Sequence, residues 1–367
     1  MESLPISQNR QDFLLMIATL ILVTIGTVMI YSSSAIIAMD RYQDGQYFLK
    51  RQVFFVALGL GLMYFLSRLP YQKLKMVAYP ALAVSFIMLL LLFVPFLGKR
   101  VGGATRWLNL GFIGFQVGEW VKVSVVLFLA FFLARKKQYV KEIVRGILTP
   151  LAVTACLMGL IILQPDFGTT AIIAVTTMIM LYLGGARIAH LLGLAAMFAP
   201  FAVWALCRGY RLERLTAFLD PWKDPHGSGF QIIQSMIAFG SGGPFGVGVG
   251  DGMQKLFYLP EPHTDFILSV IAEESGFVGV SVVIIMYTVF IIRGFMISFK
   301  APDLFGMLLA AGLTILISMQ VFINIAGVMG LIPLKGLTLP FLSYGGTSLM
   351  MSLATVGILL NISSQET

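Results

Sequence analysis

Ionisable residues within long apolar runs are the first candidates for chemistry in this sequence. Glu119 and Lys122 stand three residues apart near the start of the apolar run 117–134. Residues at i and i+3 lie on one face of a helix and are close enough to pair. Charges in such runs are costly and therefore mark functional positions by default. The sequence predicts a Glu119–Lys122 pair, which either neutralises two buried charges or belongs to a polar site, and the two roles are compatible.

A second carboxylate lies in a very short turn between two apolar runs. Asp166 is the third residue of the Gln-Pro-Asp-Phe-Gly turn 164–168, which joins the runs 147–163 and 167–185. Proline and glycine shape such a turn, and aspartate is a favoured N-cap residue for the following helix. Asp166 therefore either caps that helix or presents a carboxylate to the same face of the protein as Glu119.

A third carboxylate, Asp265, stands at the start of the apolar run 265–292. At a boundary between membrane and water, an adjacent apolar wall is expected to raise its pKa, which suits a general base. The alternative is that Asp265 caps the helix that begins there. His263 alone is more typical of a polar loop residue, and the three histidines of the chain are too scattered for a histidine-built metal site.

Glycines are unusually dense just before this carboxylate. The cluster consists of Gly240, Gly242, Gly243, Gly246, Gly248, Gly250 and Gly252. Glycines at this density permit a close backbone approach to a ligand and can form anion-binding nests. The Gly-x-Gly-x-Gly pattern within the cluster does not indicate dinucleotide binding, because no strand precedes it and no βαβ unit surrounds it.

The composition indicates that a bilayer surrounds the elements that carry these residues. Hydrophobic residues make up 58% of the 367 positions, and the mean hydropathy is +0.90. Only 11% of residues are charged, against roughly 25% in soluble domains. The net charge of +8 is spread among short loops, which argues against a nucleic-acid partner. We predict an all-α integral membrane protein in which residues 1–367 form a single polytopic domain.

About ten transmembrane helices are expected, because a spanning helix needs roughly 20 mostly apolar residues. The runs lie near 13–36, 53–67, 76–97, 117–134, 147–163, 167–185, 188–207, 265–292, 303–329 and 338–361. The turn at 164–168 leaves the fifth and sixth runs as either two short helices or one broken hairpin.

The loops with unusual residues follow the odd-numbered runs and therefore share one face of the membrane. They are 98–116, 164–167, 208–264 and 330–340. This arrangement predicts one composite site. The distribution of Lys and Arg, with less weight given to the long loop, places both termini in the cytoplasm and the loop 208–264 outside it.

Several ordered motifs resemble the SEDS family of bacterial cell-wall polymerases, which includes RodA and FtsW, over essentially the whole chain. They are Arg106-Trp107-Leu108, Phe115-Gln116 with Glu119, Gln164-Pro165-Asp166, Phe218-Leu219-Asp220-Pro221-Trp222, Gln234-Ser235, Leu259-Pro260-Glu261, His263-Thr264-Asp265-Phe266 and Pro340-Phe341-Leu342-Ser343-Tyr344-Gly345-Gly346. The stretches 335–340 and 238–240 resemble the division-type FtsW branch more than the RodA branch. One departure is Val117-Gly118, where the family usually has Pro-Ser, and this change should alter how the helix that carries Glu119 starts.

The resemblance implies a peptidoglycan glycosyltransferase that polymerises lipid II at the outer face of the bacterial cytoplasmic membrane. Asp265 would be the catalytic base that takes the proton from the 4-hydroxyl of the acceptor sugar. That oxygen would then attack the anomeric carbon of the donor, with inversion, and expel undecaprenyl pyrophosphate. No cofactor is certain, but cationic side chains or a divalent ion, Mg or Mn, would stabilise the leaving group.

The resemblance also implies a set of substrate-binding residues and a set of partners. The candidate substrate-binding residues are Arg106, Glu119, Lys122, Asp166, Arg214, Lys255, Glu261, His263 and Ser343. The expected partners are a class B penicillin-binding protein, which would crosslink the new strands, and other membrane proteins of the division or elongation machinery.

Two other functions stay open on the sequence. A flippase for lipid II would use a polar path through the membrane, for which the candidates are Glu119, Lys122, Asp166, Glu273 and Glu274. Most of these cluster toward one end of the runs, and Glu273 and Glu274, two turns into the run 265–292, are the exceptions that keep this function open. A non-enzymatic scaffold at the division or elongation site would keep its function after substitution of Asp265.

Overall fold

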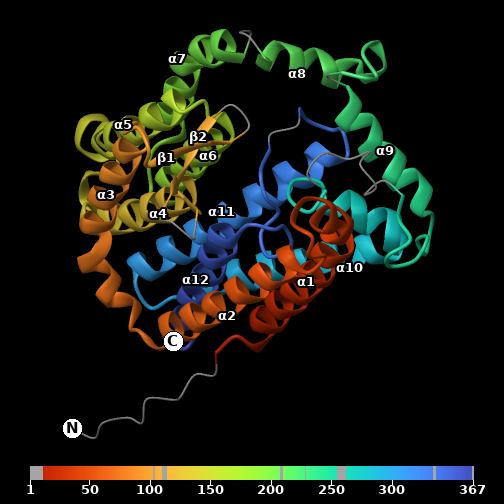
Figure 1. Cartoon of the computed structure of the whole chain (residues 1–367). Coiled ribbons are helices and arrows are strands. Elements are labelled where there is room, and N and C mark those ends of the chain that lie inside the picture. Colours follow the sequence, from red (N-terminus) through yellow and green to blue (C-terminus); the bar gives the residue numbers. More distant parts are fainter. Residues whose placement is uncertain are drawn as a thin grey trace, which may run out of the picture.

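The structure is a computed structural model that describes residues 11–101, 104–109, 114–206, 210–227, 229–253, 262–333 and 336–365. The side chains of 101, 201–206, 210–211 and 213–214 lie outside this description. Within these ranges the chain forms twelve α-helices and one small sheet (Figure 1). The helices are α1 (Phe13–Tyr42), α2 (Tyr47–Arg68), α3 (Leu74–Leu91), α4 (Val117–Arg135), α5 (Thr149–Leu163), α6 (Phe167–Leu183), α7 (Ile188–Leu206), α8 (Tyr210–Leu219), α9 (Phe230–Gly242), α10 (Ile267–Lys300), α11 (Leu304–Val328) and α12 (Gly346–Ser363).

Apolar length decides which of these helices can cross a bilayer. By length and composition, eight of the described helices could cross a membrane: α1 to α5 and α10 to α12. For α3 and α5 this includes the short helical turns that precede them, which extend the two spans to Tyr71–Leu91 and Ile143–Leu163. Helix α6 and residues Ile188–Pro200 of α7 are shorter apolar helices. The prediction of a helical membrane protein is confirmed apart from a small sheet, and α5 and α6 are two separate helices joined by a turn. Helices α4, α11 and α12 are mostly buried and form the centre of the bundle.

The last helix starts later than the sequence predicted. The apolar run begins at 338, but α12 begins at Gly346. Pro340 lacks the N–H that a helix interior needs, and Phe341 adopts a left-handed conformation with φ 69°. Residues 336–345 therefore form an irregular segment at the start of α12, which we call the α12 leader.

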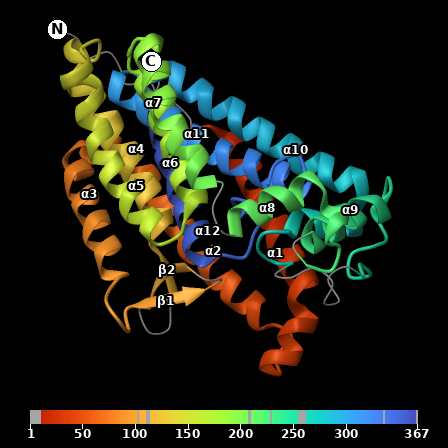
Figure 2. The same cartoon turned by 90° about the horizontal axis from the view of Figure 1, so that it is seen from above.

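The loop 98–116 contains a sheet that the sequence analysis did not predict. Strands β1 (Gly98–Val101), β2 (Ala104–Asn109) and β3 (Gly114–Gln116) pair antiparallel in the order β1-β2-β3. Strand β3 leads directly into α4, because its last residue, Gln116, is the N-cap residue of that helix. Figure 2 shows the labelled strands at one end of the helices, beyond α3 and α4. The sheet thus fixes β2, and Arg106 on it, against the start of α4.

The long loop is also partly helical, and α7, α8 and α9 follow one another around the edge of the molecule (Figure 1). The glycine cluster begins in the last turn of α9, and the residues after α9 pack against a break in α10, where Gly276 has φ 62°. The amides of Val247 and Gly248 donate to the carbonyls of Glu273 and Glu274 at 3.0 and 3.1 Å. Beyond the break, the amides of Phe277 and Val278 donate to the carbonyls of residues 243 and 244 at 2.9 and 3.1 Å.

Glycines allow this segment to pack against the backbone of α10, because a side chain at these positions would collide with the helix. A Cβ at Gly242 would lie 1.9 Å from the carbonyl oxygen of Ala272, and one at Gly246 would lie 2.1 Å from that of Glu274. The glycine cluster therefore does approach another backbone closely, and its partner in the described residues is α10.

Candidate functional site

The turn 262–266 places Asp265 two residues before Ile267, the first residue of α10. Phe266, rather than Asp265, occupies the N-cap position of α10. The Asp265 carboxylate faces the α12 leader, because a Cβ at Gly336 would lie 3.2 Å from its Oδ2. Glycine at 336 therefore leaves the carboxylate uncrowded on that side.

The backbone of this turn is held at three consecutive carbonyls. The amide of Tyr344 donates to His263 O at 2.8 Å, and the hydroxyl of Ser343 donates to Thr264 O at 2.5 Å. The side chain of one residue of α11, Asn324, donates to Asp265 O at 3.1 Å. Each of the three carbonyls accepts from a different donor. These hydrogen bonds fix the turn in the orientation that directs the Asp265 carboxylate toward the α12 leader.

Ser343, a predicted substrate-binding residue, supports this turn in the structure. Its hydroxyl donates to Thr264 O and accepts from the amide of Leu339 at 2.8 Å. The residue is buried. Ser343 therefore links the α12 leader to the turn that carries Asp265, and a contact with substrate stays a prediction.

The predicted pair on α4 is confirmed. Lys122 Nζ lies 2.8 Å from Glu119 Oε1, and the two side chains are only 1% and 8% exposed. Burial of two charges is tolerated because each neutralises the other. The pair is therefore a buried, self-neutralised ion pair near the start of α4, and it is the first of two ionic groups in this region.

Asp166 and Arg106 form a second ionic group next to the first. Asp166 is the N-cap residue of α6 and accepts from Thr169 N at 3.2 Å and from Thr169 Oγ1 at 2.8 Å. Arg106 Nε lies 3.6 Å from Asp166 Oδ2, and the same guanidinium donates to Pro165 O at 3.1 Å. The capping role of Asp166 is thus confirmed, and its carboxylate also faces a cation from β2. The Arg106 side chain stays 29% exposed.

The two ionic groups adjoin because Gly118 allows α4 and α6 to approach each other. A Cβ at Gly118 would lie 3.3 Å from Thr169 Cγ2 and 3.9 Å from Asp166 Oδ2. Helix α4 begins at Val117, so the Val-Gly departure from the family pattern leaves Glu119 in the first turn of the helix.

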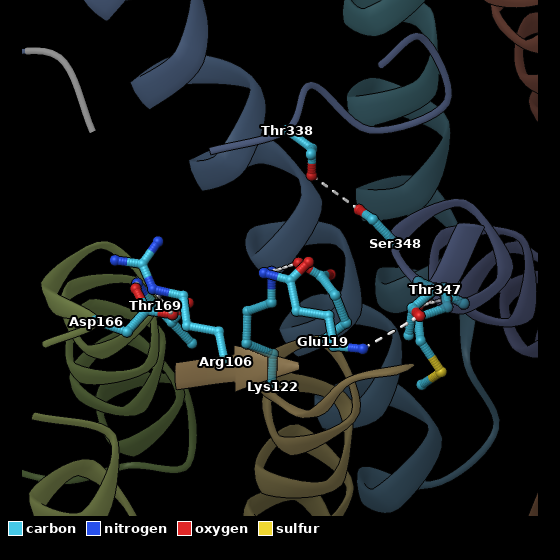
Figure 3. A network of polar contacts seen from close by, with 11 residues as sticks. Arg106, Glu119, Lys122, Asp166, Thr169, Thr338, Thr347 and Ser348 are labelled. Carbon is cyan, nitrogen blue, oxygen red and sulfur yellow. Dashed lines mark hydrogen bonds and ion pairs between the residues drawn. The ribbon is translucent and has the colours of Figure 1, made fainter. Parts of the chain in front are cut away.

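Hydroxyl groups of α12 border the charged residues on the other side (Figure 3). Thr347 Oγ1 accepts from Gln116 N at 3.2 Å and donates to Gly114 O at 3.3 Å, which ties α12 to β3. Thr338 and Ser348 share a hydrogen bond of 3.0 Å between the α12 leader and α12. In Figure 3 Glu119 and Lys122 lie between Asp166 and these hydroxyls.

The α12 leader joins the ionic groups to the turn that carries Asp265. A Cβ at Gly168, two residues after Asp166, would lie 3.1 Å from Leu337 Cδ2. The neighbouring residue, Gly336, faces the Asp265 carboxylate. The turns that carry Asp166 and Asp265 therefore meet across a single segment, as the prediction of one composite site requires.

His263 packs into this region with its ring against Phe48 at 4.6 Å and Tyr344 at 5.5 Å between centroids. Burial, and secondly the charge of Arg41, lowers the pKa of His263 from 6.5 to about 4. The imidazole is therefore neutral at physiological pH and is mainly a packing residue of the turn.

This pKa predicts a specific sensitivity to acid. Because the unfolded chain binds a proton at His263 below pH 6.5 and the folded protein does so only near pH 4, stability should fall as the pH decreases between these values. The loss from this residue is at most about 3 kcal/mol. The midpoint temperature of thermal unfolding should therefore differ less between pH 5 and pH 7.5 for His263→Gln than for the wild type. An unchanged difference would contradict the prediction.

Other predicted residues fall outside the site or outside the description. Lys255 and Glu261, and the side chain of Arg214, are not among the described atoms. Glu273 accepts from the amide of Met253 at 2.8 Å, and Glu274 accepts from Ser32 of α1 at 2.7 Å. These two carboxylates therefore have local partners at the break in α10.

Asn324 is a site residue that the sequence analysis missed. It lies in the apolar run 303–329, where a buried amide is itself an unusual feature that could have drawn notice. Within the described ranges no three His, Cys, Asp or Glu side chains are placed to hold a metal ion. A divalent ion at the leaving group stays a prediction.

A multi-pass membrane bundle with a charged site at the helix ends is the class of protein that these observations define. A family model described as a cell cycle protein, and named for FtsW, RodA and SpoVE, matches residues 12–367. The chain belongs to this family. A Trichlorobacter lovleyi relative named probable peptidoglycan glycosyltransferase FtsW is 44% identical, over 98% of this chain and 95% of its own. Stage V sporulation protein E of Bacillus subtilis is 42% identical, over 97% and 98% respectively.

Solved structures share the fold over nearly the full length. One, from work on the coordination of polymerization and crosslinking by a peptidoglycan synthase complex, has a TM-score of 0.80 at 33% identity and covers 96% of this chain and 97% of its own. The rod shape determining protein RodA of Thermus thermophilus has a TM-score of 0.70 at 28% identity, with 96% of each chain covered.

Proposed function

We propose that this protein is a peptidoglycan glycosyltransferase that polymerises lipid II, with Asp265 as the catalytic base. The observation that carries the proposal is the position of Asp265. Its backbone is anchored at three successive carbonyls, and its carboxylate faces the segment that meets the Asp166 turn. The name of the T. lovleyi relative supports the same activity.

The reaction requires one base and a stabilised leaving group. The Asp265 carboxylate accepts the proton of the acceptor sugar hydroxyl as that oxygen attacks the anomeric carbon of the donor. The bond from this carbon to the pyrophosphate oxygen breaks, and undecaprenyl pyrophosphate leaves with the electron pair. Configuration at the anomeric carbon inverts because a single displacement occurs.

Arg106 is the described cation best suited to the leaving pyrophosphate. Its side chain is 29% exposed, whereas Lys122 is 1% exposed and already paired with Glu119. An arginine can bind a phosphate oxygen through two parallel N–H donors while another part of the group faces a carboxylate. Asp166 and Pro165 therefore orient Arg106 rather than use up its donors.

The proposed location is the bacterial cytoplasmic membrane, with both termini in the cytoplasm and the site on the outer face. A lipid substrate with an anionic head group requires a site at the boundary of the membrane. The charged residues of this site lie where helices α4, α6 and α10 begin, as such a boundary position needs.

We further propose that a class B penicillin-binding protein is the partner that crosslinks the product strands. The solved relative belongs to a complex that combines polymerization with crosslinking. Relatives named FtsW support a role in cell division together with other membrane proteins of the division machinery.

The test is the polymerisation of purified lipid II by this protein together with its penicillin-binding partner, in a form of the partner that has no glycosyltransferase activity. Glycan strands resolved by gel electrophoresis are expected. Their absence, together with movement of lipid II across liposome membranes, would instead establish a flippase. The partners that Glu273 and Glu274 find within the protein weigh against that second function.

A further inference from the structure

A single amide side chain of α11 reaches both segments that flank the Asp265 carboxylate. Asn324 is buried and lies in the last turns of α11. Its Nδ2 donates to Asp265 O at 3.1 Å and to Leu337 O at 2.6 Å. A carboxamide nitrogen carries two N–H donors, so both donors of Asn324 are engaged.

The two acceptors belong to different segments beside the carboxylate. Asp265 O belongs to the residue that bears it, and Leu337 follows Gly336, whose Cβ position is 3.2 Å from Asp265 Oδ2. The turn 262–266 and the α12 leader are both irregular, so neither has a ladder of backbone hydrogen bonds to hold it. Asn324 therefore fixes the separation between the carboxylate and the segment that faces it.

Asn324 differs from Ser343 and Tyr344, the other two donors to the turn, in the element to which it belongs. Tyr344 and Ser343 hold the turn from the α12 leader, which is itself irregular. Asn324 belongs to a helix of 25 residues that is mostly buried in the centre of the bundle. Asn324 thus connects both irregular segments to a rigid element of the fold through one side chain.

We propose that Asn324 is a positioning residue for the Asp265 base. It acts through the backbone of Asp265 and Leu337 and sets where the carboxylate meets the acceptor hydroxyl. The inference rests on the proposed function. A displacement of a reacting group by about 1 Å can cost about 100-fold in rate, so loss of this anchor acts on the chemical step rather than on the binding of lipid II.

The test compares Asn324→Leu with the wild type in the lipid II polymerisation assay. We expect kcat to fall by about 10- to 100-fold, with little change in the lipid II concentration that gives half the maximal rate. Gln320→Leu is the matched control, because Gln320 is another buried amide one turn earlier on α11. It should retain nearly the wild-type kcat. Thermal unfolding of each variant confirms that the assayed protein is folded.

A second variant distinguishes positioning from a general structural role. Asn324 and Ser343 hold adjacent carbonyls of one turn, so the effects of Asn324→Leu and Ser343→Ala on kcat should be less than multiplicative in the double variant. If Asn324→Leu does not fold, Asn324→Ser, which keeps one donor, is assayed instead and should show the same effect to a smaller degree.

Wild-type kcat in a folded Asn324 variant would overturn the inference, as would a raised half-saturating concentration at unchanged kcat. Fully multiplicative effects with Ser343→Ala would also overturn it. Failure of the proposed function is a different result, because the wild type itself would then form no glycan strands.

Discussion

Asp265→Asn is expected to lower the rate of glycan polymerisation by about 10²–10⁴-fold, the range that a general base contributes. The amide has the shape of the carboxylate but cannot take the proton of the acceptor hydroxyl. The three anchors of the turn contact backbone carbonyls and are unaffected by the change. The fold and the binding of lipid II should therefore persist. The measurement is kcat for lipid II polymerisation beside the thermal unfolding of the same preparation.

Asp251→Asn is the matched control for this experiment. Asp251 is an exposed carboxylate in the glycine cluster and has no place in the proposed site. The same change of charge there should leave polymerisation close to that of the wild type. A folded Asp265→Asn protein that retains a tenth or more of the wild-type rate would exclude Asp265 as the base.

The second large effect is expected at the buried pair on α4. Lys122→Met leaves the Glu119 carboxylate buried without its cation, and loss of one partner of such a pair costs about 3–5 kcal/mol. Glu119→Gln should be similarly harmful because it leaves the ammonium of Lys122 uncompensated. The double variant Glu119→Gln/Lys122→Met contains no uncompensated charge, so it should regain most of the lost stability. Thermal unfolding in detergent compares the four proteins.

The same four proteins separate the two roles that the sequence left open for this pair. The pair adjoins the Arg106–Asp166 group through Gly118 and Thr169, so we expect the double variant to be stable but poor in polymerisation. A stable double variant with the wild-type rate would show that the pair does nothing beyond neutralising its own charges.

Local patterns in the sequence were sufficient for the parts of this site that lie within one helix. The spacing of Glu119 and Lys122 predicted their pairing, and the Gln-Pro-Asp turn gave the cap on α6 as one of two roles for Asp166. Hydropathy located the helices because long apolar stretches have few alternatives in a bilayer. The grouping of the loops followed from the order of the runs alone.

Features set by contacts between distant segments could not be predicted in this way. Hydropathy could not predict that α12 begins at Gly346, because the apolar run already starts eight residues earlier, at 338. The break in α10 at Gly276 depends on the glycine cluster that enters it. Asn324 contacts residues 59 and 13 positions away, and only the fold shows that both lie beside the same carboxylate.

The anchoring of the turn 262–266 also bears on the order in which the protein is made. Two of its three anchors come from Ser343 and Tyr344, and the hydroxyl of Ser343 lies 79 residues further along the chain than its partner. At about 5–20 residues per second, the ribosome makes Asp265 several seconds before these supports exist. The catalytic geometry is thus completed only once the α12 leader has been synthesised and α12 has joined the bundle. During its own insertion into the membrane, the nascent chain therefore lacks two of the supports of the proposed base.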